Sequence, residues 1–107
     1  MKEYDIQMSA VNWFRKTYPE YVLFSVSNEG CFKRKPYFEA LGMLKGVSDV
    51  IVILPNKVLF IEFKTSKSYQ RTEQRDFENK VSILGFSYYV CRSLEQFKDI
   101  ISSNIID

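Results

Sequence analysis

Apolar side chains recur along this 107-residue chain with two different periods, and these periods predict its secondary structure. Residues 3–18 carry apolar side chains at helical spacing, and Pro19 ends the predicted helix. Residues 21–26 are rich in strand-forming side chains and predict a strand. A turn at Asn28-Glu29-Gly30 follows, and then a basic segment, Cys31 to Lys35, which we expect to be exposed.

The middle of the chain predicts a β-hairpin. Residues 49–54 and 58–64 are two runs of β-branched and aromatic side chains, separated by Pro55-Asn56-Lys57. Such a pattern is typical of two antiparallel strands joined by a short turn. Before the hairpin, residues 37–44 predict a short helix that Lys45 and Gly46 close.

The last third of the chain predicts two helices around one strand. Thr72 is placed to cap a helix over 73–84, and Gly85 stands just past its end. A polar loop at 65–71 precedes this helix, and Phe77, Val81 and Leu84 lie on one face of it. A strand is expected at 86–91. The last helix, over 94–103, starts at the capping box of Ser93 and buries Leu94, Phe97, Ile100 and Ile101. The order α-β-(α)-β-β-α-β-α predicts an α/β fold, a mixed central sheet flanked by helices.

Composition limits both the organisation and the chemistry. The length predicts one domain, residues 1–107, with a single core. The absence of histidine excludes catalysis by Ser-His-Asp or Cys-His groups. We expect Cys31 and Cys91 to be reduced thiols in an intracellular, cytoplasmic protein. No apolar run is long enough for a membrane span, so we expect no membrane partner.

Basic charge is concentrated in the middle of the chain. Residues 31–75 contain nine lysines and arginines against four acidic residues, whereas the rest of the chain is net acidic. A phosphate-rich partner could bind there, although a solvated basic surface explains the same count equally well. The candidates for nucleic-acid contacts are Lys33, Arg34, Lys35, Lys45, Lys67 and Arg71.

Three charged residues should meet at one end of the hairpin. Glu62 and Lys64 share one face of the second strand because side chains alternate along a strand. Antiparallel pairing sets Asp49 opposite position 62 or 63, and a shift of one residue would turn its side chain to the other face. A same-face ion pair between Glu62 and Lys64 is the simpler interpretation.

Two neighbouring carboxylates with a lysine also suit metal-assisted phosphate chemistry. The carboxylates repel each other, and a divalent cation removes that repulsion. Mg²⁺ prefers oxygen ligands and needs few carboxylates when a substrate phosphate completes the site. Charges within an otherwise hydrophobic strand need a partner or a purpose, which favours this second interpretation.

These residues resemble a known family. Gly46-x-x-Asp49 followed by Ile61-Glu62-Phe63-Lys64-Thr65 is similar to the metal-dependent PD-(D/E)XK nucleases, and closest to their VRR-NUC branch. Further elements of the resemblance, in the same order along nearly the whole chain, are Glu3 and Gln7, Asn28-Glu29-Gly30, Gln74 and Phe77, Gly85, and Ser93-Leu94-Glu95. Ser48 departs from the family pattern, which has a proline before the aspartate.

The resemblance implies a restriction-endonuclease-like core (α-β-β-β-α-β-α) and a role for each matching residue. Asp49 and Glu62 are implied to bind Mg²⁺, or Mn²⁺ in its place, together with the main-chain carbonyl of Phe63. Glu3 is implied to complete the metal site, with Asp5 as a neighbouring alternative. The implied catalytic residues are Asp49, Glu62, Lys64 and Gln74, and no organic cofactor is expected.

The function expected from this resemblance is that of a metal-dependent DNA endonuclease. Small members of the branch imply a homodimer that cuts branched DNA such as four-way junctions, and a phage-encoded source that acts in the host cell. Two alternatives stay open. One is a catalytically silent module of the same fold that binds nucleic acid or protein, and the other is an enzyme that cuts RNA.

Overall fold

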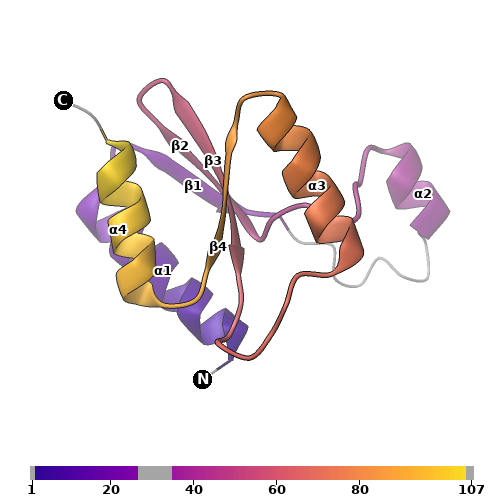
Figure 1. The fold of residues 1–107 in the computed structure, drawn as a ribbon. Helices are drawn as coiled ribbons and strands as arrows, with labels where there is room; N and C mark the ends of the chain where they lie inside the picture. The colour runs from indigo at the N-terminus through magenta and orange to yellow at the C-terminus, as the bar shows by residue number, and fades with distance from the viewer. Residues whose placement is uncertain (1, 27–34, 106–107) are drawn as a thin grey trace.

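The computed structural model describes residues 2–26 and 35–105, which form one four-stranded sheet with helices on both faces (Figure 1). The second strand continues directly into the third through Pro55 and Asn56, and Asn56 adopts φ 60° in this tight turn. The elements are α1 (Glu3–Thr17), β1 (Val22–Ser25), α2 (Lys35–Ala40), β2 (Val50–Leu54), β3 (Lys57–Phe63), α3 (Thr72–Ile83), β4 (Ser87–Cys91) and α4 (Leu94–Asn104).

The sheet is mixed, as the order of elements predicts. The strands lie in the order β1-β2-β3-β4; the first three are antiparallel, and β4 runs parallel to β3. The parallel pair needs a crossover connection, and α3 provides it. Val50 pairs with Ile61, so the hairpin register places position 49 opposite position 62.

The hydrophobic core lies between the sheet and the helices α1 and α4. Alternate residues of each strand point to this face and meet the apolar stripes of the two helices. The fully buried side chains of this layer include Phe14, Val50, Val52, Leu59, Ile61, Phe63, Phe97 and Ile101. Trp13 and Tyr18 pack partly buried against it.

The opposite face of the sheet is covered only in part. Helix α3 packs there against β3 and β4, where Phe60 contacts the rings of Phe77 and Phe86. No helix among residues 2–26 and 35–105 covers the same face of β1 and β2, and Val22, Phe24 and Ile53 are exposed on it. Helix α2 lies beyond α3, on the side away from α1 and α4 (Figure 1).

Two predicted helix boundaries are wrong. Helix α2 spans Lys35–Ala40 rather than 37–44, because the chain turns at Gly42, whose φ of 105° no helix allows. Helix α3 has Arg71 and not Thr72 as its N-cap, because the side chain of Gln74 already accepts the Arg71 amide at 2.9 Å.

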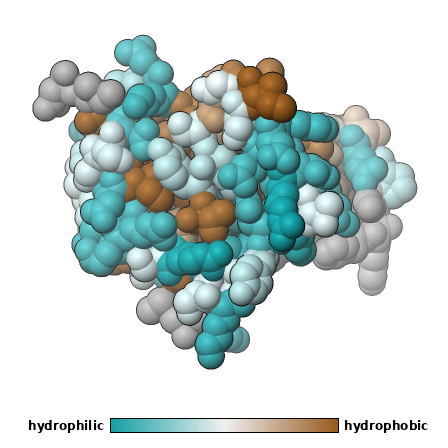
Figure 2. Space-filling model, viewed as in Figure 1, coloured by the Kyte–Doolittle hydropathy of each residue, from teal (hydrophilic) through white to brown (hydrophobic). Residues whose placement is uncertain are grey.

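The apolar helix face predicted from Phe77, Val81 and Leu84 is shorter than expected. Leu84 is 73% exposed, because α3 ends at Ile83 and carries its last turn past the sheet. Apolar side chains accordingly gather over this end of α3, on a view that is otherwise mostly hydrophilic over the helix (Figure 2). The predicted strands, the end of α3 at Gly85 and the Ser93 cap of α4 are confirmed.

Some predictions lie outside the described residues, namely the turn at Asn28-Glu29-Gly30 and most of the basic segment from Cys31. Cys91 is buried and reduced, and burial raises the pKa of its thiol. Within residues 2–26 and 35–105, no helix combines the length and the apolarity that crossing a lipid bilayer requires.

Candidate functional site

Asp49 and Glu62 meet on the face of the sheet that carries α3. Asp49 directly precedes β2 and Glu62 is the penultimate residue of β3, and the register sets them opposite each other. Residues opposite each other in an antiparallel pair point to the same face. The predicted juxtaposition of the two carboxylates is confirmed.

The two carboxylates are held by different partners. Asp49 accepts the Phe63 amide at 2.7 Å, which fixes its carboxylate across the end of the hairpin. Glu62 is 2% exposed, and its Oε2 accepts a hydrogen bond of 2.6 Å from Nε2 of Gln74. The other oxygen, Oε1, is buried and has no hydrogen-bond partner among the described residues. An unpartnered buried carboxylate oxygen is costly, and a bound cation would satisfy it.

Burial raises the pKa of both carboxylates. Burial, and then the charge of Asp49, raise the pKa of Glu62 to about 8 although the Lys64 ammonium opposes the shift. Burial also raises the pKa of Asp49, while its bond to the Phe63 amide and the charge of Lys64 oppose the rise. Loss of hydration is the main cause of both shifts, and a divalent cation bound between the groups would reverse them.

Lys64 and Gln74 complete the polar cluster under α3. The Lys64 side chain is 8% exposed, and its Nζ lies 3.8 Å from Oε2 of Glu62. Gln74 uses both ends of its amide, because Oε1 accepts the Arg71 amide and Nε2 donates to Glu62. Gln74, whose side chain binds the amide of the N-cap residue Arg71, therefore also orients Glu62.

Gly46 brings the segment before β2 against the first turn of α3. It has φ 92°, and a Cβ atom there would lie 2.3 Å from the main-chain oxygen of Glu73. Lys45 next to it forms an ion pair of 3.3 Å with Glu73. Ser48, in place of the family proline, is fully buried and donates from its hydroxyl to the carbonyl of Val50 at 3.1 Å. The departure at Ser48 therefore leaves no unsatisfied hydroxyl beside Asp49.

Glu3 lies beside the pair but is bound elsewhere. Its charge contributes to raising the pKa of both Asp49 and Glu62, and its Oε2 accepts the Ser68 hydroxyl at 2.9 Å. Asp5 instead accepts the main-chain amide of Lys2 at the start of α1. In the part of the chain that the structure describes, no group of three or more acidic or cysteine side chains is arranged to hold a metal ion. Asp49 and Glu62 are therefore the carboxylates available together to a cation.

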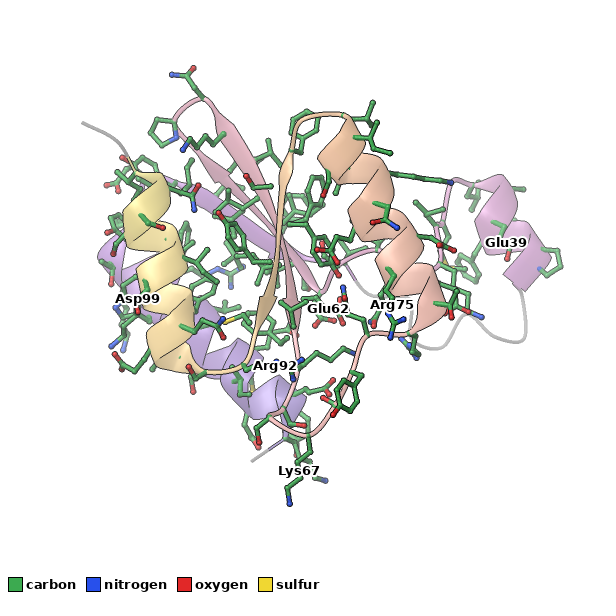
Figure 3. The ribbon with its side chains drawn as sticks, in the orientation of Figure 1. Glu39, Glu62, Lys67, Arg75, Arg92 and Asp99 are labelled. Carbon is green, nitrogen blue, oxygen red and sulfur yellow. The ribbon has the colours of Figure 1, made fainter. Side chains whose placement is uncertain are left out.

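A network around the 65–71 loop was not predicted from the sequence. The guanidinium of Arg92 donates to the main-chain carbonyls of Thr65 and Ser68 and ties the loop to the end of β4 (Figure 3). Ser68 in turn connects the loop to Glu3 on α1. A single arginine after a strand carries no recognisable signal in the sequence, because the partners it binds are main-chain atoms 24 and 27 positions away.

The predicted basic residues divide into four groups. Lys67 and Arg71 are exposed on the 65–71 loop, whereas Lys45 is held by its ion pair with Glu73. Lys33 and Arg34 lie outside the described residues, and Lys35 begins α2.

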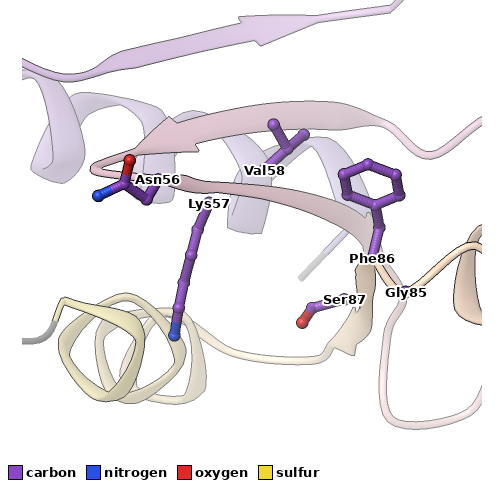
Figure 4. Close-up of a pocket in the computed structure, with 6 residues that line it drawn as sticks. All are labelled: Asn56, Lys57, Val58, Gly85, Phe86 and Ser87. Carbon is purple, nitrogen blue, oxygen red and sulfur yellow. The ribbon is translucent and has the colours of Figure 1, made fainter.

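A shallow pocket of about 260 Å³ lies at the other end of the sheet. Its walls come from the β2–β3 turn and the α3–β4 turn (Figure 4). The lining residues are Asn56, Lys57, Val58, Gly85, Phe86 and Ser87, and none is acidic. The pocket and the carboxylate pair are therefore separate features at opposite ends of β3.

Comparison with known proteins identifies the fold. No protein-family model and no curated protein sequence matches the chain. A solved structure named "VRR_NUC domain protein" superposes with a TM-score of 0.80 at 18% identity, over 98% of this chain and 88% of that one. Another, named "VRR_NUC domain", gives a TM-score of 0.71 at 21% identity, over 98% of this chain and 99% of that one. The chain has the VRR_NUC fold, which confirms the restriction-endonuclease-like architecture implied by the sequence resemblance.

Proposed function

We propose that this chain is a metal-dependent DNA endonuclease that hydrolyses phosphodiester bonds at the Asp49–Glu62 pair. The observation that carries the proposal is Oε1 of Glu62, which is buried and has no partner among the described residues, on a carboxylate that lies opposite Asp49 and pairs with Lys64 through its other oxygen. A structural ion pair between Glu62 and Lys64 alone does not account for that oxygen. The fold shared with VRR_NUC domains supports the same function.

The donor set suits a hard divalent cation, Mg²⁺ or Mn²⁺ in its place. Asp49 and Glu62 would hold the ion, together with the main-chain carbonyl of Phe63, and Glu3 would add negative charge beside them. When bound, such an ion neutralises the carboxylates, polarises a scissile phosphate and lowers the pKa of a water molecule.

The remaining residues have separate roles in this proposal. Gln74 keeps Glu62 in place through its 2.6 Å hydrogen bond, so that the carboxylate stays oriented when it is ionised. Lys64, held buried beside Glu62, would position the attacking water and stabilise negative charge that develops on the phosphate. Lys67 and Arg71, both exposed, would contact the DNA backbone.

We also propose that the enzyme is a homodimer that selects branched DNA such as four-way junctions, inside the cell where its substrate lies. Two cuts on a symmetric DNA require two sites, which a symmetric dimer supplies. The exposed apolar side chains Val22, Phe24 and Ile53 on the open face of β1 and β2 support an association between copies. Mass measurement in solution, with Phe24→Glu as the disrupting variant, tests this assembly.

Cleavage assays test the activity directly. Labelled four-way junction, duplex DNA and RNA are incubated with Mg²⁺, with Mn²⁺ and with chelator. We expect junction cleavage that requires metal and falls at least about a hundredfold in Glu62→Gln and in Lys64→Ala. Glu95→Gln and Lys80→Ala are the matched controls, because both side chains lie on exposed helix surfaces.

The rival functions give different results in the same assay. DNA binding without cleavage in either metal would indicate a catalytically silent module. Metal-dependent cleavage of RNA with DNA left intact would indicate a ribonuclease. Cleavage that survives both Glu62→Gln and Lys64→Ala would contradict the assignment of the site itself.

A further inference from the structure

Tyr69 is the most exposed aromatic side chain in the described part of the chain. Its exposed fraction is 79%, compared with 42–56% for the other exposed aromatic residues, Tyr4, Tyr37, Phe24 and Phe86. No ring contact or side-chain hydrogen bond within residues 2–26 and 35–105 involves it. A ring left in water makes little contribution to the core and is free to contact a partner.

The residues on either side of Tyr69 are anchored. Ser68 binds Glu3 through its hydroxyl and accepts the Arg92 guanidinium at its carbonyl, at 2.9 and 2.8 Å. Gln70 donates its side-chain amide to Glu78 at 3.0 Å and to the Tyr88 hydroxyl at 3.3 Å. A loop fixed on both sides of an exposed ring presents that ring with little further loss of conformational entropy on binding.

The anchored loop adjoins the carboxylate pair. Tyr69 is five residues from Lys64 and five from Gln74, so its main chain lies within about 18 Å of either. Ser68 is bonded to Glu3, whose charge acts on both Asp49 and Glu62. A nucleotide that contacts Tyr69 would therefore lie near a phosphate at the site.

Positive charge flanks the ring on both sides. Lys67 and Arg71 stand two residues before and two after Tyr69, and both are exposed. Lys67 points away from the body of the molecule at the tip of the loop (Figure 3). An exposed aromatic ring between two cations is the combination that binds an unpaired nucleotide, because the base stacks on the ring and the cations hold the backbone.

We infer that the 65–71 loop is a binding site for an unpaired nucleotide of DNA, with Tyr69 stacking on the base. The inference rests on the proposed branched-DNA substrate and adds that a nucleotide left unpaired at the branch point binds beside the scissile phosphate. Fully paired duplex lacks an open base face, so it would engage only the cations of the loop.

Binding measurements on two matched probes test the inference. One probe is a duplex with a single unpaired 2-aminopurine, and the other is the same duplex with 2-aminopurine paired to thymine. Affinity is measured by fluorescence anisotropy in the Glu62→Gln background, so that the probes are not cut. Stacking on Tyr69 should quench 2-aminopurine in the unpaired probe.

We expect Tyr69→Ala to weaken binding of the unpaired probe about tenfold and of the paired probe less than twofold. Tyr69→Trp and Tyr69→Phe should keep both the affinity and the quenching, because they keep a ring. Lys67→Ala should weaken both probes alike, since phosphates are common to both. Leu84→Ala removes an exposed apolar side chain at the other end of α3 and should change neither probe.

Three results would overturn the inference: equal loss for both probes in Tyr69→Ala, no loss for either, or no binding of either probe by the parent protein. The test is independent of the nuclease proposal. If the parent protein shows metal-dependent cleavage and Tyr69→Ala binds both probes as well as the parent, the stacking inference is wrong and the nuclease proposal stands. If binding depends on Tyr69 but no cleavage is seen, the nuclease proposal is wrong and the stacking inference stands.

Discussion

The two faces of the sheet differ in the number of their buried polar side chains and in whether these are fully hydrogen-bonded. On the face covered by α1 and α4, which carries the hydrophobic core, the buried side chain of Asn104 donates to the Tyr89 hydroxyl and to the Ile100 carbonyl and accepts the Lys57 ammonium. On the face covered by α3, Glu62, Lys64 and Gln74 are all buried, and one oxygen of Glu62 has no partner among the described residues. The first face is built for stability, and the second accepts an energetic cost that a bound ion would relieve.

Gln74 shows how the second face is kept ordered. Its side chain joins the start of α3 to Glu62, so the polar cluster is part of the secondary structure. Gly46 adds close packing between the segment before β2 and the same turn of α3. The charged residues therefore sit in a rigid frame, which is what a preorganised site requires.

The largest expected effect is on the apolar face. Phe14→Ala removes a fully buried ring that packs against Phe97, so we expect a loss of about 3–5 kcal/mol in the free energy of unfolding. Ile83→Ala, at a side chain 84% exposed at the end of α3, should cost less than about 1 kcal/mol. Urea unfolding measures both, and similar losses would show that the end of α3 is covered in solution.

Two glycines with nearly equal φ angles distinguish the effect of close packing from the effect of backbone strain on stability. Gly46 and Gly85 have φ of 92° and 94°, but only a Cβ at Gly46 would clash with Glu73, and nothing lies within 4 Å of one at Gly85. Gly85→Ala should cost about 1 kcal/mol, and Gly46→Ala more than about 2 kcal/mol.

Gly46→Ala should also lower cleavage by displacing the turn that carries Gln74, while Gly85→Ala should leave cleavage unchanged. Unfolding and cleavage measured on the two variants together check this. Equal stability losses would mean that the contact between Gly46 and α3 is unimportant.

The pH dependence of stability should reveal the burial of Glu62 beside Asp49. The pKa of Glu62 rises from an ordinary value of 4.5 to about 8 in the folded protein, so the folded state keeps a proton that the unfolded chain has lost. The stabilisation is complete below pH 4.5 and is lost as the pH rises to about 8, by at most about 1.4 kcal/mol per pH unit.

Thermal unfolding in chelator at pH 6 and pH 8 measures this loss, and Glu62→Gln provides the control. That variant should unfold with a smaller difference between the two pH values and should be more stable than the parent at pH 8. A parent protein that is equally stable at both pH values would contradict the burial of an ionisable pair.

The smallest expected effect is a competition between protons and cation. Since the cation binds the ionised pair, the apparent affinity for Mn²⁺ should rise with pH from 6 to 8, by at most about tenfold per unit. Calorimetric titration of the metal-free protein measures it, with Glu62→Gln as the variant that should lose both the binding and its pH dependence. Binding of Mn²⁺ that persists in Glu62→Gln would place the ion elsewhere.

The strands and most helix boundaries of this protein follow from local sequence. The hairpin of β2 and β3 is predicted by two β-branched runs and a turn, and its register follows once the turn is tight at Pro55 and Asn56. That register places Asp49 opposite Glu62, so the heart of the site is also predictable. The helix caps were harder to predict. The sequence indicates Thr72 as the cap of α3, whereas Arg71 is the N-cap and its amide binds the side chain of Gln74.

Long-range packing determines which groups share the site and which remain outside it. Glu3 turns to Ser68, Arg92 binds main-chain carbonyls of a distant loop, and Tyr69 is left in water between anchored neighbours. Local sequence encodes backbone preference and the alternation of faces, which act over a few residues. Contacts between α1, the 65–71 loop and β4 depend on packing of segments far apart in the chain, and a single sequence carries no local signal for them.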